Sequence, residues 1–468
     1  MPLSGGIVDA QLYPLPPTSR KAPKLLKFPL SRKPGAGPGV REKPSLRMPS
    51  GTPGPEAVQF QRKNPCKRPE NRLSLFEEMK FLIVHNRYSR SGGEEGVVEF
   101  QRRLLERRGH SVVVYERAYD EVRRWRFGRF AALFSALYNR RAVGEVRRIV
   151  RRERPDVAIV HNLFPVVSGA VLPVLKRGGV RVLMTLHNYR LVCPIGLFYT
   201  RGEICERCGF AFGREWNCLR RRCEGSWAGS FGFSLRGWWS RRRGYFSKSV
   251  DRFLALSAFQ REVVSRYTGI PVERFAVVPN AVDPAEMPVP TREALEARRR
   301  YVAYAGRLSA EKGIDLLFET ARRLPAVEFR VAGEAAEGYR LPEVPENVRL
   351  MGKLDRQQLA DLYAGAVGAV VTSRWYEGFP LTVVEAMYYG VPVAVPELAG
   401  MPEMVDRGRC GAVYAPGSAE ELAEVVRGWV DEPQRAAELG AGGRERVLTC
   451  YGPEAYYRAL IENATDGV

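Results

Sequence analysis

Residues 301–313 read Tyr-Val-Ala-Tyr-Ala-Gly-Arg-Leu-Ser-Ala-Glu-Lys-Gly. The apolar run 301–305 has the length and composition of a buried β-strand, and a glycine follows it directly. Arg307 ends the strand, and Lys312 lies five positions on, in the expected first turn of a helix that Ser309 can cap. A strand that passes through a turn into a helix is the repeating unit of an α/β sheet.

Similar apolar runs recur along the chain, each short and continuous. They lie at 80–85, 111–115, 157–161, 180–186, 253–256 and 275–278, and then at 301–305, 327–332, 348–351, 367–372, 391–395 and 411–414. Continuous apolar strands separated by helices indicate parallel sheets that are covered on both faces. We therefore predict two doubly wound α/β domains, joined near 279–291. Ligands bind beyond the carboxyl ends of such strands, so we expect the site in the cleft between the domains.

The composition supports a folded chain of more than one domain. Of 468 residues, 45% are hydrophobic and 27% are charged, which excludes collagen, coiled coil and wholesale disorder. The longest apolar runs, such as 391–395, fall far short of the roughly 20 residues that cross a bilayer. The net charge of +21 suggests anionic partners such as phosphates, nucleic acid or lipid headgroups.

Four segments are expected along the chain. Residues 1–78 hold 14 of the 33 prolines and show no helical or strand periodicity, so we predict a disordered Pro/Arg-rich extension without a signal peptide. Met79 is a candidate true start of translation. An N-terminal domain is predicted at 79–285 and a C-terminal domain at 286–450. A terminal helix at 451–468 is expected to cross back over the join.

Two carboxylates stand eight positions apart within residues 376–387. Glu377 is expected in a loop at the end of a strand, and Glu385 about one turn into the next helix. Gly378 leaves the backbone at the start of that helix open to a ligand. A carboxylate accepts several hydrogen bonds, which suits the vicinal hydroxyls of a ribose or a hexose. Burying Glu385 among apolar neighbours would be costly without such a partner.

Basic and glycine-rich turns provide candidate phosphate sites. Arg307 and Lys312 flank a helix N-terminus, whose backbone N–H groups favour an anion, so they predict a diphosphate pocket; solvated surface charge is the alternative. Gly92 and Gly93 would let backbone N–H groups approach a phosphate after the first strand, although an ordinary turn would also use them. The full three-glycine dinucleotide fingerprint is absent, which lowers the case for a nicotinamide or flavin enzyme.

These motifs carry a resemblance to a known family. Gly-Arg-Leu-x-x-x-Lys-Gly at 306–313, Glu-Gly-Phe-Pro at 377–380 and Glu-Ala-Met at 385–387 resemble glycosyltransferase family 4, and the similarity covers about residues 79–465. Members of that family are retaining enzymes of the GT-B fold. The resemblance implies two Rossmann-like domains and the transfer of a hexose from a nucleotide-diphosphate sugar. The acceptor, held by the first domain, would be a glycan or a lipid-linked precursor of a polysaccharide or cell-envelope glycan.

The resemblance also implies residues that would contact the donor: Gly92, Gly93, Arg307, Lys312, Glu377, Gly378, Phe379, Pro380 and Glu385. Arg307 and Lys312 would hold the diphosphate, Glu385 the nucleotide ribose, and Glu377 with the 378–380 backbone the sugar hydroxyls. His187, at the end of a predicted strand, resembles the histidine that contacts the donor sugar near the scissile bond. A satisfied polar residue is the alternative there. The candidate catalytic residues are then His187, Arg307, Lys312 and Glu377.

Cleavage of a sugar–phosphate bond places negative charge on the departing diphosphate, so fixed positive charge is needed beside it. The chain has no Asp-x-Asp sequence, the usual metal-holding carboxylate pair of the other nucleotide-sugar architecture. Arg307 and Lys312 would therefore replace the metal. We expect a metal-independent reaction that requires no cofactor.

A cysteine cluster follows His187. Its spacing is Cys205-x2-Cys208-x9-Cys218-x4-Cys223. Four thiolates at such spacing predict a closed, structural zinc site that pins a loop facing the acceptor. Free thiols are the alternative, and the sequence does not decide between the two.

Aromatic residues alternate with arginines at 238–248, and again at 123–129. This pattern is typical of an interfacial membrane helix, whose rings lie at headgroup level and whose cations bind anionic lipid. A solvated helix face and a nucleic-acid patch are the alternatives, and we expect no nucleic-acid partner. The protein would then be cytoplasmic and peripheral on the inner face of the cytoplasmic membrane.

Rival functions share parts of this pattern. A nucleotide-sugar epimerase of the same fold would need further His and acidic groups acting on the sugar ring. A glycogen-type phosphorylase would need a lysine-bound pyridoxal phosphate. A basic nucleic-acid-binding protein would show steeply salt-dependent affinity, and would leave Glu377 and Glu385 without a purpose.

Overall fold

This computed structural model describes residues 78–87, 93–124, 128–209, 213–296 and 301–466. Of the extension predicted as disordered at 1–78, only Glu78 falls within these ranges. Gly92 also lies outside the described residues.

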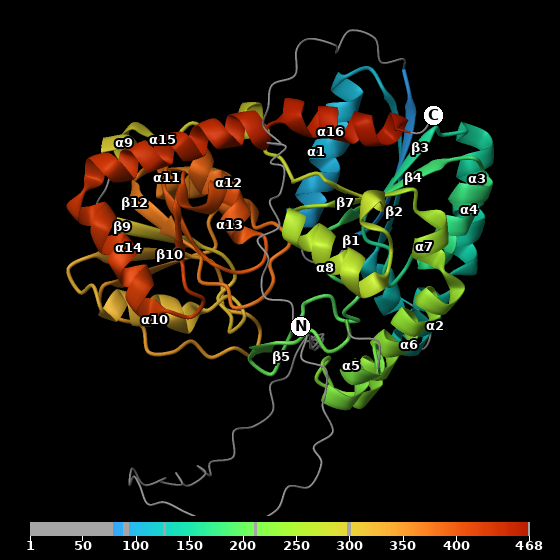
Figure 1. Cartoon of the computed structure of the whole chain (residues 1–468), viewed down its shortest axis with the longest axis horizontal. Helices are drawn as coiled ribbons and strands as arrows, with labels where there is room; N and C mark the ends of the chain where they lie inside the picture. Colours follow the sequence, from blue (N-terminus) through green and yellow to red (C-terminus); the bar gives the residue numbers. More distant parts are fainter. Residues whose placement is uncertain (1–77, 88–92, 125–127, 210–212, 297–300, 467–468) are drawn as a thin grey trace, which may run out of the picture. The chain divides into compact units, whose positions relative to one another are not determined.

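Within the described ranges, six strands form the first sheet, in the order β2-β1-β3-β4-β7-β8, and every neighbouring pair is parallel. The strands are β1 (Lys80–Arg87), β2 (Ser111–Ala118), β3 (Val157–Val160), β4 (Arg181–Leu186), β7 (Arg252–Ala255) and β8 (Phe275–Val277). All four residues of β3 are buried, because helices cover both faces of the sheet (Figure 1).

The second sheet also has six strands in the described part of the chain, in the order β11-β10-β9-β12-β13-β14, again all parallel. They are β9 (Tyr301–Ala305), β10 (Glu328–Ala332), β11 (Val348–Gly352), β12 (Ala366–Val370), β13 (Val393–Pro396) and β14 (Ala412–Tyr414). The strand order reverses between β1 and β3 in the first sheet and between β9 and β12 in the second, and ligands bind at such reversals. The predicted fold class, two doubly wound parallel sheets, is confirmed.

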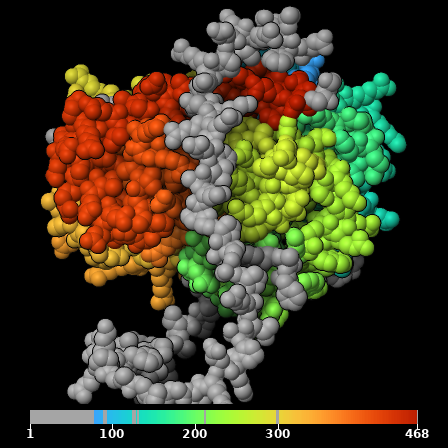
Figure 2. Space-filling view, viewed as in Figure 1, coloured from blue at the N-terminus to red at the C-terminus, as the bar shows by residue number. Residues whose placement is uncertain are grey.

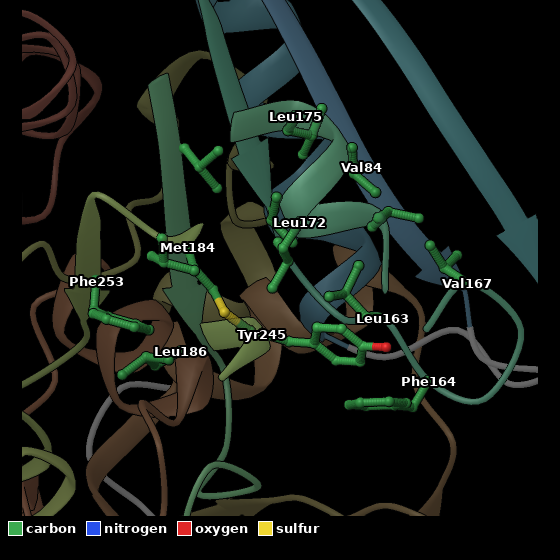
Figure 3. Close-up of a cluster of buried hydrophobic side chains, with 14 of the residues drawn as sticks. Val84, Leu163, Phe164, Val167, Leu172, Leu175, Met184, Leu186, Tyr245 and Phe253 are labelled. Atoms are coloured by element: carbon green, nitrogen blue, oxygen red, sulfur yellow. The ribbon is translucent and has the colours of Figure 1, made fainter. Parts of the chain in front are cut away.

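The helices that accompany the first sheet, here called the first half, form from capped, amphipathic segments. They are α1 (Gly93–Arg107), α2 (Gly128–Leu137), α3 (Arg140–Glu153), α4 (Leu172–Arg177), α5 (Trp216–Arg221), α6 (Trp227–Arg243), α7 (Tyr245–Ser249) and α8 (Ala258–Thr268). In α3 the Asn139 side chain caps the N-terminus, and Ala142, Val143, Val146 and Val150 form one buried stripe. Figure 3 shows the resulting core, with Val84 of β1, Leu172 of α4, Met184 of β4 and Phe253 of β7 packed together.

The second half adds α9 (Arg292–Glu296), α10 (Ile314–Arg322), α11 (Arg356–Ala364), α12 (Leu381–Tyr388), α13 (Met401–Met404), α14 (Ala419–Asp431), α15 (Pro433–Cys450) and α16 (Pro453–Thr465). Helix α11 begins with a capping box, in which Asp355 and Gln358 each satisfy a backbone N–H of the other. Among the described helices, none combines the length and the apolar composition needed to cross a bilayer.

The last helix, α16, belongs to the core of the first sheet. Tyr456 and Leu460 pack with Phe81 of β1 and Phe100 of α1, and α16 lies beside α1 (Figure 1). Figure 2 shows the last helices, in red, at the surface of the molecule. The domain boundaries at 79–285, 286–450 and 451–468 stay a prediction.

A small antiparallel hairpin, β5 (Tyr199–Thr200) and β6 (Glu203–Ile204), lies in the cysteine-rich region and was not predicted. Its two turn residues, Arg201 and Gly202, both have positive φ, at 57° and 82°. Such φ values define the turn whose twist matches a two-residue hairpin. The sequence did not predict this turn because its first position holds arginine, whereas such turns favour asparagine, aspartate or glycine there.

Candidate active site

The candidate site lies where the strand order of the second sheet reverses. Strand β9 leads into Arg307 and Lys312, and β12 leads into the loop that carries Glu377. The Thr372 hydroxyl donates to the Lys312 carbonyl (2.8 Å). A Cβ atom on Gly313 would stand only 2.0 Å from the Thr372 carbonyl oxygen. The two loops are therefore in direct backbone contact, which only glycine permits at position 313.

The predicted start of helix α10 was wrong. The helix begins at Ile314, so Lys312 precedes it, and its N-cap is Gly313 with φ of 67°. Ser309 does not cap it, and its buried hydroxyl has no hydrogen-bond partner among the described residues. The physical reason is the contact with Thr372, which holds Gly313 in the left-handed region and delays the helix.

Glu377 is the most heavily bonded carboxylate of the candidate site, and it is only 6% exposed. It accepts hydrogen bonds from Lys312 Nζ (2.6 Å), Ser373 Oγ (2.6 Å) and Trp375 Nε1 (2.8 Å), and all three reach Oε1. Burial alone would raise the pKa of Glu377, but the Lys312 charge and these bonds hold it below the usual value. Glu377 is therefore an ionised carboxylate whose Oε2 lies outside the three bonds.

Arg307 and Lys312 pair with different carboxylates. Arg307 contacts Glu311 (2.6 Å) and its side chain is 57% exposed, whereas Lys312 contacts Glu377 and is 22% exposed. An exposed ion pair contributes only about 0–1 kcal/mol. Arg307 can therefore exchange Glu311 for a more highly charged anion at little cost, while Lys312 is fixed in place.

Glu385 lies one turn into α12, on a half-buried part of the helix. Burial raises its pKa, and the opposing charge of Arg356 does not cancel that effect. The first N–H groups of α12 have no partner within the helix. Glu385 is therefore a desolvated carboxylate near the start of α12.

Residues of the first half meet this loop. A Cβ atom on Gly378 would lie 2.8 Å from the His187 carbonyl oxygen, and one on Gly93 would lie 3.2 Å from Leu381 Cδ1. His187 directly follows β4, and Gly93 begins α1. The structure thus brings His187 and Gly93 next to the Glu377 loop, although their roles stay predictions, as do those of Phe379 and Pro380.

A pocket opens at the carboxyl ends of β3 and β4. Its polar lining consists of Glu94, His161, Asn162, Thr185, His187, Asn188 and Arg190. The Glu94 Oε1 atom is buried without a hydrogen-bond partner among the described residues, and it lies 3.6 Å from His85 Nδ1. Burial raises the pKa of Glu94 to about 8. Glu94 is a carboxyl group that stays protonated near neutral pH.

We expect Glu94→Gln to flatten the pH dependence of stability. The folded state keeps a proton that the unfolded chain loses near pH 4.5, so the Glu94 contribution to stability falls as pH rises from about 4.5 to 8. The amide has no such loss, and the variant should gain stability over the parent toward pH 8. Thermal unfolding from pH 6.5 to 8.5 measures this, because the stability linked to His85 changes between its lowered pKa of about 4 and its ordinary value of 6.5, below that range.

The matched control is Glu106→Gln, an exposed position on the same helix. It should leave the pH profile unchanged. A constant difference between Glu94→Gln and the parent at all pH values would contradict the protonated state of Glu94.

Tyr376 is a site residue that sequence reasoning missed. Its hydroxyl donates to Glu206 Oε1 (3.0 Å), and Tyr267 donates to the other oxygen (2.7 Å). Its ring packs edge-on against Phe198 and Phe259 of the first half. The clue in the sequence was the bulky aromatic residue directly before Glu377, because an exposed loop that binds a donor does not require one.

The predicted zinc site at Cys205, Cys208, Cys218 and Cys223 is not supported. Within the part of the chain that the structure describes, no group of three or more His, Cys, Asp or Glu side chains is arranged to hold a metal ion. Cys208 and Cys218 lie in the apolar core, and burial raises the pKa of the Cys208 thiol. None of these four cysteines forms a disulfide.

Solved structures of known proteins share this architecture. A sucrose-phosphate synthase from Thermosynechococcus elongatus superposes with a TM-score of 0.61 at 18% identity, over 82% of this chain and 99% of that one. The Anabaena protein HepE, solved in complex with UDP and glucose, gives 0.56 at 18% identity, over 83% and 100%. At this identity the likeness shows the fold, which is GT-B.

Sequence comparison defines the class. The profile described as Glycosyltransferase Family 4 matches residues 90–286, and the one described as Glycosyl transferases group 1 matches residues 290–446. Between them they span most of the chain. The chain therefore belongs to the glycosyltransferases of the family 4 type, and so to a class of enzymes.

Curated relatives agree with this class. The glycogen synthase of Mycobacterium tuberculosis is 28% identical over 212 residues, which are 43% of this chain and 51% of that protein. The alpha-maltose-1-phosphate synthase of Mycolicibacterium smegmatis is 29% identical over 253 residues, 46% and 62% respectively. The chain thus spans about half the length of the curated relatives that it matches first.

Proposed function

We propose that the chain is a retaining glycosyltransferase that moves a hexose from a nucleoside diphosphate sugar to a hydroxyl of a glycan or lipid-linked acceptor. The observation that carries the proposal is the cluster at the reversal of the second sheet, in which Lys312 Nζ lies 2.6 Å from Glu377 Oε1. The relatives named for glycogen and maltose-1-phosphate synthesis support it, and HepE, solved with UDP and glucose, makes a UDP-sugar the first donor to test.

The proposed reaction breaks the bond between the anomeric carbon and the β-phosphate oxygen, whose electron pair leaves with the diphosphate. Arg307 and Lys312 would stabilise that developing charge without a metal ion. The acceptor hydroxyl would attack from the side that the diphosphate leaves, which retains the anomeric configuration. Its proton would pass to the departing phosphate oxygen, so the step needs no separate general base.

The carboxylates would orient the donor. Glu377 is fixed through Oε1, so Oε2 can accept hydrogen bonds from sugar hydroxyls, beside the 378–380 backbone. Glu385 would accept from the ribose hydroxyls, and two charge-assisted bonds would offset the cost of its burial. Gly92 and Gly93 would approach the donor from the first domain.

A donor screen tests the function. Purified protein is incubated with UDP-, GDP- and ADP-sugars, and thermal stabilisation and donor hydrolysis are measured with the parent and with Glu385→Ala. We expect one nucleotide to stabilise the parent and to lose most of that effect in the variant. The absence of any response to all donors would overturn the proposal.

We also propose that the protein is cytoplasmic and attaches to an anionic membrane surface through α2 and α6. Phe134 of α2 is 66% exposed, and Trp227 and Phe231 of α6 are 53% and 42% exposed. The two helices touch where Leu133 approaches Gly232. Neighbouring exposed aromatic side chains of this kind mark surfaces that bind partners or membranes.

We expect Trp227→Ser combined with Phe231→Ser to abolish co-flotation with vesicles that contain anionic lipid. The aromatic rings are a better target than the arginine run, because Arg241 already pairs with Glu215 (2.6 Å) and Arg243 stacks on Trp239 (4.6 Å). Val289→Ser removes an 83% exposed apolar side chain elsewhere and should leave flotation unchanged. Equal flotation of the parent and the double variant would contradict this surface.

A further inference from the structure

A chain of hydrogen bonds links the last helix to the candidate catalytic histidine. Gln101 Nε2 donates to the Tyr456 hydroxyl (2.7 Å), and Gln101 Oε1 lies 2.9 Å from His161 Nε2. His161 Nδ1 then lies 2.8 Å from His187 Nε2. Tyr456, Gln101 and His161 are 4%, 0% and 1% exposed, so water does not compete for these bonds. This chain of hydrogen bonds joins α16, α1 and the ends of β3 and β4.

The placement of the Gln101 amide sets the direction of the bonds. Its nitrogen faces Tyr456 and its oxygen faces His161, and because that oxygen can only accept, His161 carries its proton on Nε2 in this arrangement. A neutral His161 then has an unprotonated Nδ1, which accepts from His187 Nε2. His187 therefore carries its proton on Nε2, and its Nδ1 has the free lone pair.

Both rings are neutral. The rings meet edge to edge, with planes 16° apart and centroids 5.1 Å apart, and two positive charges at that distance would repel each other. Burial lowers the pKa of His161 well below its usual value and that of His187 to about 3. The tautomer, rather than the charge, is thus the variable that the chain of bonds controls.

We propose that Tyr456 and Gln101 are positioning residues that fix His187 as the Nε2–H tautomer, so that its Nδ1 accepts a hydrogen bond from a hydroxyl of the donor sugar. This rests on the proposed function. In the opposite tautomer an N–H group would face that hydroxyl, and the bond would have to be reversed or lost. Helix α16 would thereby act on the reaction although it contacts no substrate.

The first test reads the tautomer directly. The chain contains only four histidines, so full-length protein labelled with nitrogen-15 histidine gives a simple spectrum that His→Gln variants assign. We expect His187 with a protonated Nε2 and an unprotonated Nδ1. Gln101→Met keeps the side-chain length and removes the acceptor, and it should shift His161 and His187 toward a mixture of tautomers. A parent protein with a protonated His187 Nδ1 would overturn the proposal.

The second test reads the consequence. Tyr456→Phe removes the hydroxyl that accepts from the Gln101 amide nitrogen, and we expect it to lower kcat by about 10-fold, the value of one hydrogen bond, with little change in acceptor KM. Tyr457→Phe is the matched control. It lies on the same helix and also loses a bond to a histidine, His110 Nε2 (2.8 Å), outside the chain of bonds, and it should retain kcat.

The outcomes separate the two proposals. If the parent shows the expected tautomer and transfers sugar, but Tyr456→Phe transfers as fast as the parent, the positioning role is overturned and the proposed function stands. If no donor is turned over by the parent, the proposed function fails and the role toward a donor sugar fails with it. The tautomer itself is still judged by the spectra. Should Gln101→Met fail to fold, Tyr456→Phe supplies both readouts.

Discussion

Lys312→Ala is expected to lower kcat by about 100- to 1,000-fold, the loss found when one fixed group that stabilises transition-state charge is removed. Lys312 is only 22% exposed and is held by Glu377, so solvent cannot replace it easily. The same change leaves Glu377 buried without its main opposing charge, so the pKa of Glu377 should rise and the protein should lose stability. Steady-state kinetics and thermal unfolding measure the two effects.

The control for this variant is Lys353→Ala, which removes the same charge from an exposed position after β11. It should keep both the rate and the melting temperature. A Lys312→Ala enzyme that retains kcat within a few-fold would contradict the proposed role of this cation. Loss of parent activity on addition of a chelator would contradict the metal-independent step.

Glu385→Gln is expected to have effects of opposite sign on stability and on binding. Burial raises the pKa of Glu385 in the folded state, so without a ligand its contribution to stability falls as pH rises above the ordinary carboxyl value. The amide avoids this cost, and the ligand-free variant should be more stable than the parent at pH 7–8. The affinity for the nucleotide should fall by about 10- to 100-fold, because charge-assisted bonds to the ribose are lost.

Glu424→Gln, on the exposed face of α14, is the matched control and should change neither quantity. Unfolding midpoints with and without nucleotide, together with isothermal titration, measure the two effects separately. Lower stability of ligand-free Glu385→Gln would contradict the idea that this carboxylate is strained until a donor binds. Unchanged affinity would remove its role toward the ribose.

The sequence predicted the sheets well because their strands are buried on both faces. Runs such as 301–305 and 157–160 are apolar without interruption, which is typical of strands that are buried on both faces. The hairpin at 199–204 escaped notice because two-residue strands carry no periodicity. Motif spacing placed Glu377 and Glu385 on a loop and the following helix, as the structure has them.

Partners within the site were harder to predict. Lys312 and Glu377 are 65 positions apart, and nothing in either motif shows that Gly313 and Thr372 bring them together. Serine is a common N-cap residue, so Ser309 was expected to cap α10, but the backbone contact at Gly313 overrides this local preference. For the cysteines, a spacing that suits zinc equally suits thiols that pack in a core, as Cys208 and Cys218 do.

The position of α16 has a consequence for how the protein acquires its structure during synthesis. Phe81 and Phe100 emerge early from the ribosome, yet Tyr456 and Leu460, which cover them, emerge several hundred residues later. One face of the first sheet therefore stays partly uncovered while the second sheet is being synthesised. The exposed apolar surface favours association with chaperones in that interval. Ribosome-bound chains arrested before α16 should be far more sensitive to protease in the first half than released ones.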